Sequence, residues 1–138
     1  MLTPAGPDHA QIAAVQGVLD YFDDVYEHHF DVAAPPTERR VALNRMFREH
    51  ENTLLARLLD FLRSRDDVQI IGPDTLKNRA PTVSIIPQHK DIDAVYESLT
   101  KHKLMLGKGD FYAVRPLTGM GIPRPPGVLR ISFCITRV

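Results

Sequence analysis

The sequence has little cysteine and no long apolar run. Its 138 residues include a single cysteine, Cys134, which excludes an intrachain disulfide framework and a metal site built from several cysteines. This scarcity fits a reducing compartment, and we expect a cytoplasmic protein. No stretch approaches the roughly 20 apolar residues that cross a bilayer. The N-terminus also lacks the basic and apolar regions of a secretory signal, so we expect no membrane partner.

Net charge and metal-binding patterns are missing as well. Seventeen Lys and Arg residues balance seventeen Asp and Glu residues, so charge gives no reason to expect nucleic acid as a partner. His28 and His29 are adjacent, and their side chains would point about 100° apart on a helix, too far to hold one ion together. We therefore expect no metal site.

Two long helices are predicted in the first half of the chain. Asp8 is the expected N-cap of the first helix, and Gly17 within it is interpreted as a site of close packing. Thr37 is the expected N-cap of the second helix, which runs to about residue 64. Steps of three and four predict a buried face on the first helix, formed by Ile12, Val15, Leu19, Phe22 and Tyr26. The corresponding face of the second helix consists of Val41, Met46 or Phe47, Leu54, Leu55, Leu58, Leu59 and Leu62.

The second half of the chain is predicted to form a sheet and one more helix. β-branched segments bounded by Gly and Pro predict strands at residues 68–71 and 81–86, and Asp91 begins a helix that ends near residue 101. Four further segments are predicted, namely a strand at 104–106, an extended piece at 111–114, a loop at 116–127 and a strand at 128–135. This order predicts an α+β fold, a two-layer sandwich with a mostly antiparallel sheet and helices packed on one face. We expect a single domain over residues 1–138, and interpret the terminal strand without a capping element as a sign of truncation.

Six segments carry a family resemblance when they are taken in chain order. They are P-A-G-P-D-H at 4–9, an Ala- and Gly-containing helix with Tyr21 at its end, E-x-x-L-L-x-x-L-L at 51–59, R-A-P-T-V-S at 79–84, G-D-F-Y-A at 109–113 and V-L-R-I-S-F at 128–133. Together they resemble the C-terminal small domain of the class V aminotransferases, particularly the cysteine desulfurase-like branch.

The resemblance implies a pyridoxal phosphate-dependent transferase of fold type I that acts as a homodimer on a small amino-acid-like substrate. In that family a large domain supplies the Schiff-base lysine and most of the cofactor site. The chain alone is therefore expected to be inactive and to bind no cofactor. Its expected partners are the large domain of the same enzyme and a second subunit.

Arg130 stands where the resemblance places the arginine that binds the substrate carboxylate. A guanidinium suits this task because its planar fork donates two parallel hydrogen bonds to one carboxylate. Leu129 and Ile131 alternate with Arg130 along the predicted strand, so the arginine is expected to point away from their shared face. The alternative is a solvated arginine on the outer face of the sheet.

The resemblance also assigns an active-site loop to Asp110, Phe111, Tyr112 and Arg115. Related enzymes often carry histidine where Asp110 stands, and an acidic residue there would repel an acidic substrate. The alternative for this segment is a strand edge with ordinary aromatic packing.

Three more positions are interpreted by comparison with the family. Gly6 would place its backbone N–H near the cofactor phosphate, because Pro7 stands where many members have a threonine. No cysteine occurs between residues 107 and 127, where true desulfurases keep their nucleophile, and Cys134 is expected to be a buried, inert thiol. Lys90, preceded by a histidine as in the family's Schiff-base motif, is interpreted as a solvated lysine near a helix start.

Two other functions stay open at this point. The chain could be a stand-alone α+β ligand-binding or dimerisation module without pyridoxal phosphate, or an adaptor that docks through its second helix. The residues do not distinguish an aminotransferase from a desulfurase or lyase.

Overall fold

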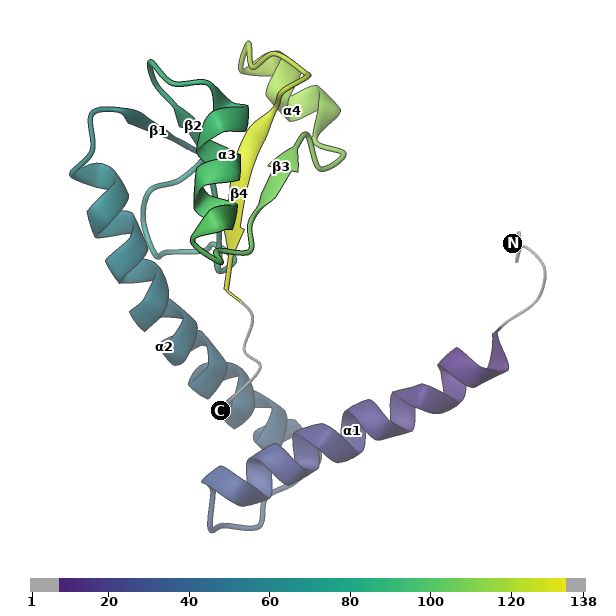
Figure 1. Ribbon diagram of the computed structural model, residues 1–138. Coiled ribbons are helices and arrows are strands. Elements are labelled where there is room, and N and C mark those ends of the chain that lie inside the picture. Colours follow the sequence, from purple (N-terminus) through teal and green to yellow (C-terminus); the bar gives the residue numbers. More distant parts are fainter. Residues whose placement is uncertain (1–7, 134–138) are drawn as a thin grey trace. The chain divides into compact units, whose positions relative to one another are not determined.

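The computed structural model describes residues 8–133, which fall into two compact units (Figure 1). The boundary lies inside the second helix, after Glu49. The first unit contains α1 (His9–His29) and the beginning of α2 (Pro36–Arg63), and the second contains the rest of α2 and the whole sheet. The single domain expected over residues 1–138 stays a prediction.

Helix α1 starts where the sequence predicts it. The Asp8 carboxylate accepts hydrogen bonds from the backbone N–H groups of Ala10 at 3.0 Å and Gln11 at 3.3 Å, which confirms the expected N-cap. The expected close packing at Gly17 is wrong, because a Cβ atom built there meets nothing within 4 Å.

The buried face predicted for α1 is mostly exposed. Tyr26 alone is buried in this helix, whereas the side chains of Ile12, Val15, Leu19 and Phe22 are 39% to 60% exposed. The physical reason is the lack of a covering surface within the first unit. There α1 has only the beginning of α2 as a neighbouring element, too little to bury a complete face of a 21-residue helix.

The connection between α1 and α2 is held by Arg39 and Tyr26. The Arg39 guanidinium donates to the Ala34 carbonyl at 2.9 Å, forms an ion pair with Asp23 at 3.1 Å, and lies over the Tyr26 ring. The Tyr26 hydroxyl donates to the Val32 carbonyl at 3.0 Å.

The expected N-cap at Thr37 is wrong, because α2 already begins at Pro36. Proline is favoured at a first helical position, where its missing N–H would have no helical partner. The Pro35 carbonyl then accepts the first hydrogen bonds of the helix, from the N–H groups of Glu38 at 2.9 Å and Arg39 at 3.0 Å.

The second unit is built on a four-stranded antiparallel sheet in the order β1-β2-β4-β3 (Figure 1). Its strands are β1 (Val68–Ile71), β2 (Thr82–Pro87), β3 (Gly107–Gly109) and β4 (Val128–Ser132). Strand β4 is therefore flanked on both sides, by β2 and by β3.

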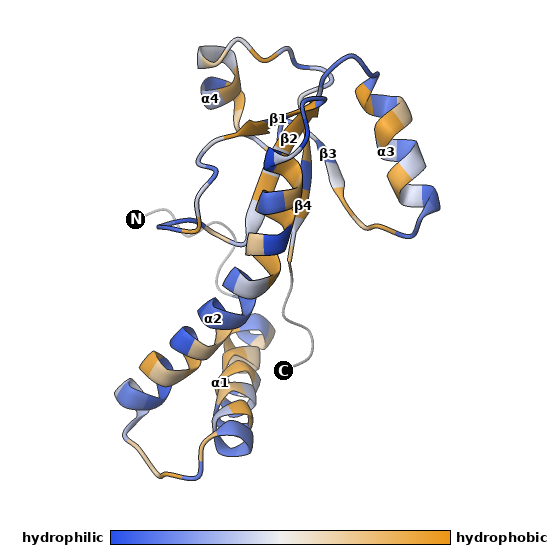
Figure 2. Cartoon of the chain, turned by 90° about the vertical axis from the view of Figure 1, so that its left-hand side faces the viewer, coloured by the Kyte–Doolittle hydropathy of each residue, from blue (hydrophilic) through white to orange (hydrophobic). Residues whose placement is uncertain are grey.

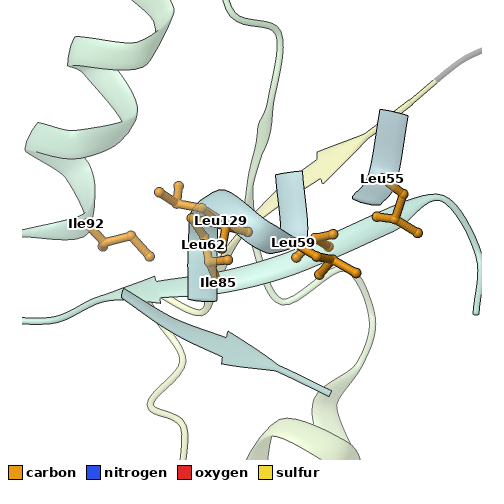
Figure 3. Close-up of a cluster of buried hydrophobic side chains, with 7 residues drawn as sticks. Leu55, Leu59, Leu62, Ile85, Ile92 and Leu129 are labelled. Atoms are coloured by element: carbon orange, nitrogen blue, oxygen red, sulfur yellow. The ribbon is translucent and has the colours of Figure 1, made fainter. Parts of the chain in front are cut away.

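One face of this sheet carries the main core. Alternating residues of β2 and β4 face the helices, so that Val83, Ile85 and Leu129 are buried. They pack against α2 and against α3 (Ile92–Lys101), whose N-cap Asp91 accepts a hydrogen bond from the Ala94 N–H at 3.0 Å. Figure 3 shows Ile85 and Leu129 of the sheet next to Leu55, Leu59, Leu62 and Ile92 of the helices.

The opposite face is covered at one end by the short helix α4 (Val114–Gly119), which the sequence reasoning missed. Leu117 of α4 and Ile122 pack against Val128 of β4, and Figure 2 shows α3 and α4 on opposite sides of the sheet. The predicted α+β class with an antiparallel sheet and helices is confirmed.

Two local predictions in the second unit are wrong. The strand expected at 104–106 forms instead at Gly107–Gly109, since Lys103 turns with a φ of 62° and Met105 is 97% exposed. The extended piece expected at 111–114 does not form, because Phe111 and Tyr112 take left-handed φ angles of 50° and 62° and α4 then begins.

Candidate functional site

Arg130 lies in the middle of strand β4. Its neighbours Leu129, 0% exposed, and Ile131 face the core under α2 and α3, so the arginine points to the opposite face, as predicted. In the register of the sheet, Arg130 is paired with Ser84 of β2 and with Gly107 of β3. The guanidinium is thus carried by an inner strand that is fixed on both sides.

The Arg130 guanidinium is partly buried and stacked on an aromatic ring. Its central carbon lies 3.8 Å from the centroid of the Phe111 ring. Among residues 8–133, Arg130 has no hydrogen bond or ion pair to another side chain. The ring covers one face of the guanidinium, whereas its N–H groups have no partner in this range. The solvated arginine weighed from the sequence therefore stays an alternative to carboxylate binding.

The loop that carries Phe111 is held by a carboxylate. Asp110 accepts a hydrogen bond from the Tyr112 N–H at 3.1 Å through one oxygen, and its other oxygen pairs with the Arg124 guanidinium at 3.3 Å. Arg124 also donates to the Thr118 hydroxyl at 3.1 Å. The negative charge of Asp110 is therefore balanced by Arg124, in a pair that is partly exposed.

Glycines allow this loop to approach the sheet closely. A Cβ atom at Gly107 would lie 2.7 Å from the Phe111 ring, and one at Gly127 would lie 2.4 Å from the carbonyl oxygen of Gly109. Gly127 also has a φ of 78°, which other residues rarely adopt. Gly127 thus requires glycine, whereas a side chain at Gly107 would displace the Phe111 ring.

The residues predicted for the site separate into two groups. Phe111 lies against Arg130, and Asp110 holds the loop that carries Phe111. Tyr112 is 99% exposed and Arg115 is also exposed on α4, without a contact to Arg130. Gly6 and Cys134 lie outside the described residues.

Sequence reasoning missed Gly107, Ser84 and Arg124 as neighbours of the site. Gly107 and Ser84 follow from the strand register, which the sequence does not specify. Arg124 lies in a segment interpreted as a loop, fourteen residues from its partner Asp110, and no local signal marked it.

Lys90 fits its interpretation as an ordinary exposed lysine. Its ammonium group forms an ion pair with Asp67 at 3.0 Å, and Arg65 pairs with the same carboxylate at 2.6 Å. Hydrogen bonds from Arg65 and then Lys90 hold the pKa of the Asp67 carboxyl well below its usual range. Lys108, the partner of Asp93, has a pKa raised chiefly by the hydrogen bond to that carboxylate.

Membrane spans and metal clusters do not occur in the described part of the chain. No helix within residues 8–133 is long and apolar enough to cross a membrane. Over the same residues, no three His, Cys, Asp or Glu side chains lie where they could hold a metal ion.

The comparisons with known proteins give one informative likeness. No family model matches the sequence, and no curated protein matches it. A solved apo structure of the cysteine desulfurase from Thermococcus onnurineus NA1 is similar, with a TM-score of 0.54 and 25% sequence identity over 69% of this chain. The chain spans only 23% of the length of that enzyme. It shares a small α+β fold with one part of a cysteine desulfurase.

Proposed function

We propose that this chain is the small-domain part of a pyridoxal phosphate-dependent enzyme of the class V aminotransferase or cysteine desulfurase-like type. In this proposal Arg130 binds the carboxylate of a small amino-acid-like substrate and helps to close the active site. The large domain of the same enzyme and a second subunit complete the site.

The environment of Arg130 is the observation that carries the proposal. Arg130 lies on a sheet whose fold is similar to part of a cysteine desulfurase, and its guanidinium has no carboxylate partner within residues 8–133. Arg39, Arg63, Arg65 and Arg124 each form an ion pair with an acidic side chain, whereas Arg130 forms none within residues 8–133. A guanidinium with open in-plane donors on a fixed strand is suited to bind an external carboxylate.

Asp110 was expected from its charge to repel an acidic substrate, and its pairing makes this repulsion weaker. Its pairing with Arg124 balances the negative charge beside the site. We therefore propose that Asp110 shapes the loop under Phe111 and does not itself repel the substrate carboxylate.

The lysines with described partners do not fit the role of holding pyridoxal phosphate. A Schiff-base lysine needs a neutral amine, and its pKa is lowered for that purpose. Lys90 is ion-paired with Asp67, and the pKa of Lys108 is raised by Asp93, which is the opposite direction. We therefore assign the Schiff base with pyridoxal phosphate to neither of these lysines.

Carboxylate binding by the 138-residue chain tests the proposal. L-Alanine and its amide, which lacks the carboxylate, are titrated into the protein while backbone NMR shifts are followed. We expect L-alanine alone to shift signals around Arg130, Ser84 and Gly107. Arg130→Gln should weaken this binding about ten-fold or more, the value of lost charge-assisted hydrogen bonds.

Arg115→Gln is the matched control, because Arg115 is an exposed arginine in the same predicted loop region. Equal effects of L-alanine and its amide, or equal weakening by the two variants, would refute the carboxylate site. Incubation with pyridoxal phosphate followed by borohydride gives an independent check. Stoichiometric labelling of one lysine would contradict the assignment of the Schiff base to other polypeptide.

A further inference from the structure

The stacking of Phe111 on Arg130 determines which donors of the guanidinium stay open. A guanidinium has two flat faces and an edge along which its N–H groups point. The ring at 3.8 Å covers one face, whereas hydrogen bonds to an anion form in the plane. We infer that Phe111 is a positioning residue that fixes the Arg130 guanidinium so that its in-plane edge receives a single planar carboxylate. This inference rests on the proposed function.

Strand β3, next to Arg130, has a glycine at the position where a side chain would meet the Phe111 ring. Gly107 is paired with Arg130 across β3 and β4, so a side chain at this position would stand on the same face as the arginine. A Cβ atom there would lie 2.7 Å and 2.8 Å from two carbons of the Phe111 ring. The ring thus occupies the space that a side chain at Gly107 would fill, directly beside the arginine.

The loop holds the ring in place at a conformational cost. Phe111 and Tyr112 both have left-handed φ angles, 50° and 62°, which residues with side chains seldom adopt. Asp110 supports this conformation through its hydrogen bond to the Tyr112 N–H and its ion pair with Arg124. The Ala113 N–H donates to the Asp110 carbonyl at 2.8 Å and closes the turn.

Packing of Phe111 in the small apolar cluster is a second role that the test must separate from positioning. The ring also contacts the cluster of Leu117, Ile122 and Val128. Loss of that packing alone would lower stability without altering the environment of the arginine. A readout at the guanidinium itself is therefore needed.

The Nε–H resonance of Arg130 in the ligand-free chain provides this readout. A proton held over a ring face is shifted upfield by the ring current, so we expect the Arg130 signal to lie upfield of the other arginine signals. Phe111→Leu should remove the shift. Tyr112→Leu, a change of the neighbouring aromatic residue that is 99% exposed, should leave the signal in place.

Gly107→Ala supplies a second variant in case Phe111→Leu fails to fold. It keeps the phenyl ring but pushes it away from the arginine, and should also remove the upfield shift. An Arg130 signal at the position of a solvated arginine in the unmodified chain would overturn the inference without any variant.

Affinity for L-alanine separates this inference from the proposed function. If Phe111 positions the guanidinium, Phe111→Leu should weaken L-alanine binding about three-fold, the value of a cation–π contact at a partly exposed site. An upfield signal with no L-alanine binding would refute the proposed function while leaving the stacking intact. Unchanged affinity in a folded Phe111→Leu protein that has lost the shift would refute the positioning role alone.

Discussion

Among the carboxyl groups of residues 8–133, Asp67 has a pKa that its neighbours clearly lower. Hydrogen bonds from Arg65 and Lys90 favour its ionised form, so its pKa in the folded protein lies below the ordinary value of 3.8. A group with a lowered folded pKa stabilises the protein above its unfolded pKa, and this stabilisation is lost as the pH falls toward the folded pKa.

We therefore predict that Asp67→Asn lowers the free energy of unfolding near neutral pH. The difference from the unmodified protein should shrink as the pH falls below about 4. Urea unfolding at a series of pH values measures it. Asp66→Asn, a change of the exposed neighbouring carboxylate, is the control. A difference between the proteins that stays constant down to the lowest pH would contradict this role of Asp67.

Gly127 is a residue at which only glycine fits. Gly127→Ala would combine a left-handed φ with a Cβ atom 2.4 Å from the backbone oxygen of Gly109. We predict a loss of at least about 1–2 kcal/mol in the free energy of unfolding, the cost of the left-handed conformation alone. Gly119→Ala, where nothing lies within 4 Å of the new Cβ, should change stability by less than about 0.5 kcal/mol. Equal thermal stability of the two variants would contradict the close approach of β3 to the residues before β4.

At the scale of the elements, local patterns predicted those parts of the fold that local chemistry decides. Asp8 and Asp91 cap their helices because an acidic side chain at that position satisfies free N–H groups whatever the tertiary structure. The alternation in β2 and β4 likewise gave the direction of Arg130. The candidate site could be predicted to this extent.

Tertiary contacts decide the parts that the sequence did not reveal. Phe111 and Tyr112 take left-handed conformations in a loop held by Asp110 and Arg124, which are far apart in the chain. Strand β3 forms at Gly107–Gly109 and not at the more apolar residues 104–106. The glycines of β3 leave room for the Phe111 ring and for the close approach of Gly127. No short sequence pattern predicts any of these contacts.

The three leucines of α2 are predicted to hold the sheet and the helix together. Leu59 is 0% exposed at the centre of this core (Figure 3), and Leu59→Ala should lower the free energy of unfolding by about 2–5 kcal/mol. Leu104→Ala, at a position that is 54% exposed, should cost less than about 0.5 kcal/mol. Denaturant unfolding of both variants checks this expectation, and similar costs for the two would contradict the placement of the core.

At the scale of the whole molecule, the first unit has more apolar surface than it can cover. A hollow of about 880 Å³ between α1 and the beginning of α2 is lined in part by Leu19, Phe22 and Phe47. Exposed apolar patches of this kind favour association. In the proposed enzyme, other polypeptide would cover this surface.

We therefore predict that the 138-residue chain self-associates as its concentration rises. The double change Ile12→Lys and Val15→Lys on α1 should shift the sedimentation profile toward monomer. The double change Leu104→Lys and Met105→Lys, at exposed apolar positions of the second unit, is the control for two added charges. A chain that stays monomeric at every concentration would contradict the need for a covering partner.

The central claim is that the edge of the Arg130 guanidinium receives a carboxylate while its face rests on Phe111. A crystal structure of the chain with L-alanine tests this most directly. The account predicts both carboxylate oxygens within hydrogen-bond distance of Arg130 nitrogens and in the guanidinium plane, with the phenyl ring still stacked. A carboxylate bound elsewhere, with Arg130 extended into solvent away from the ring, would contradict it.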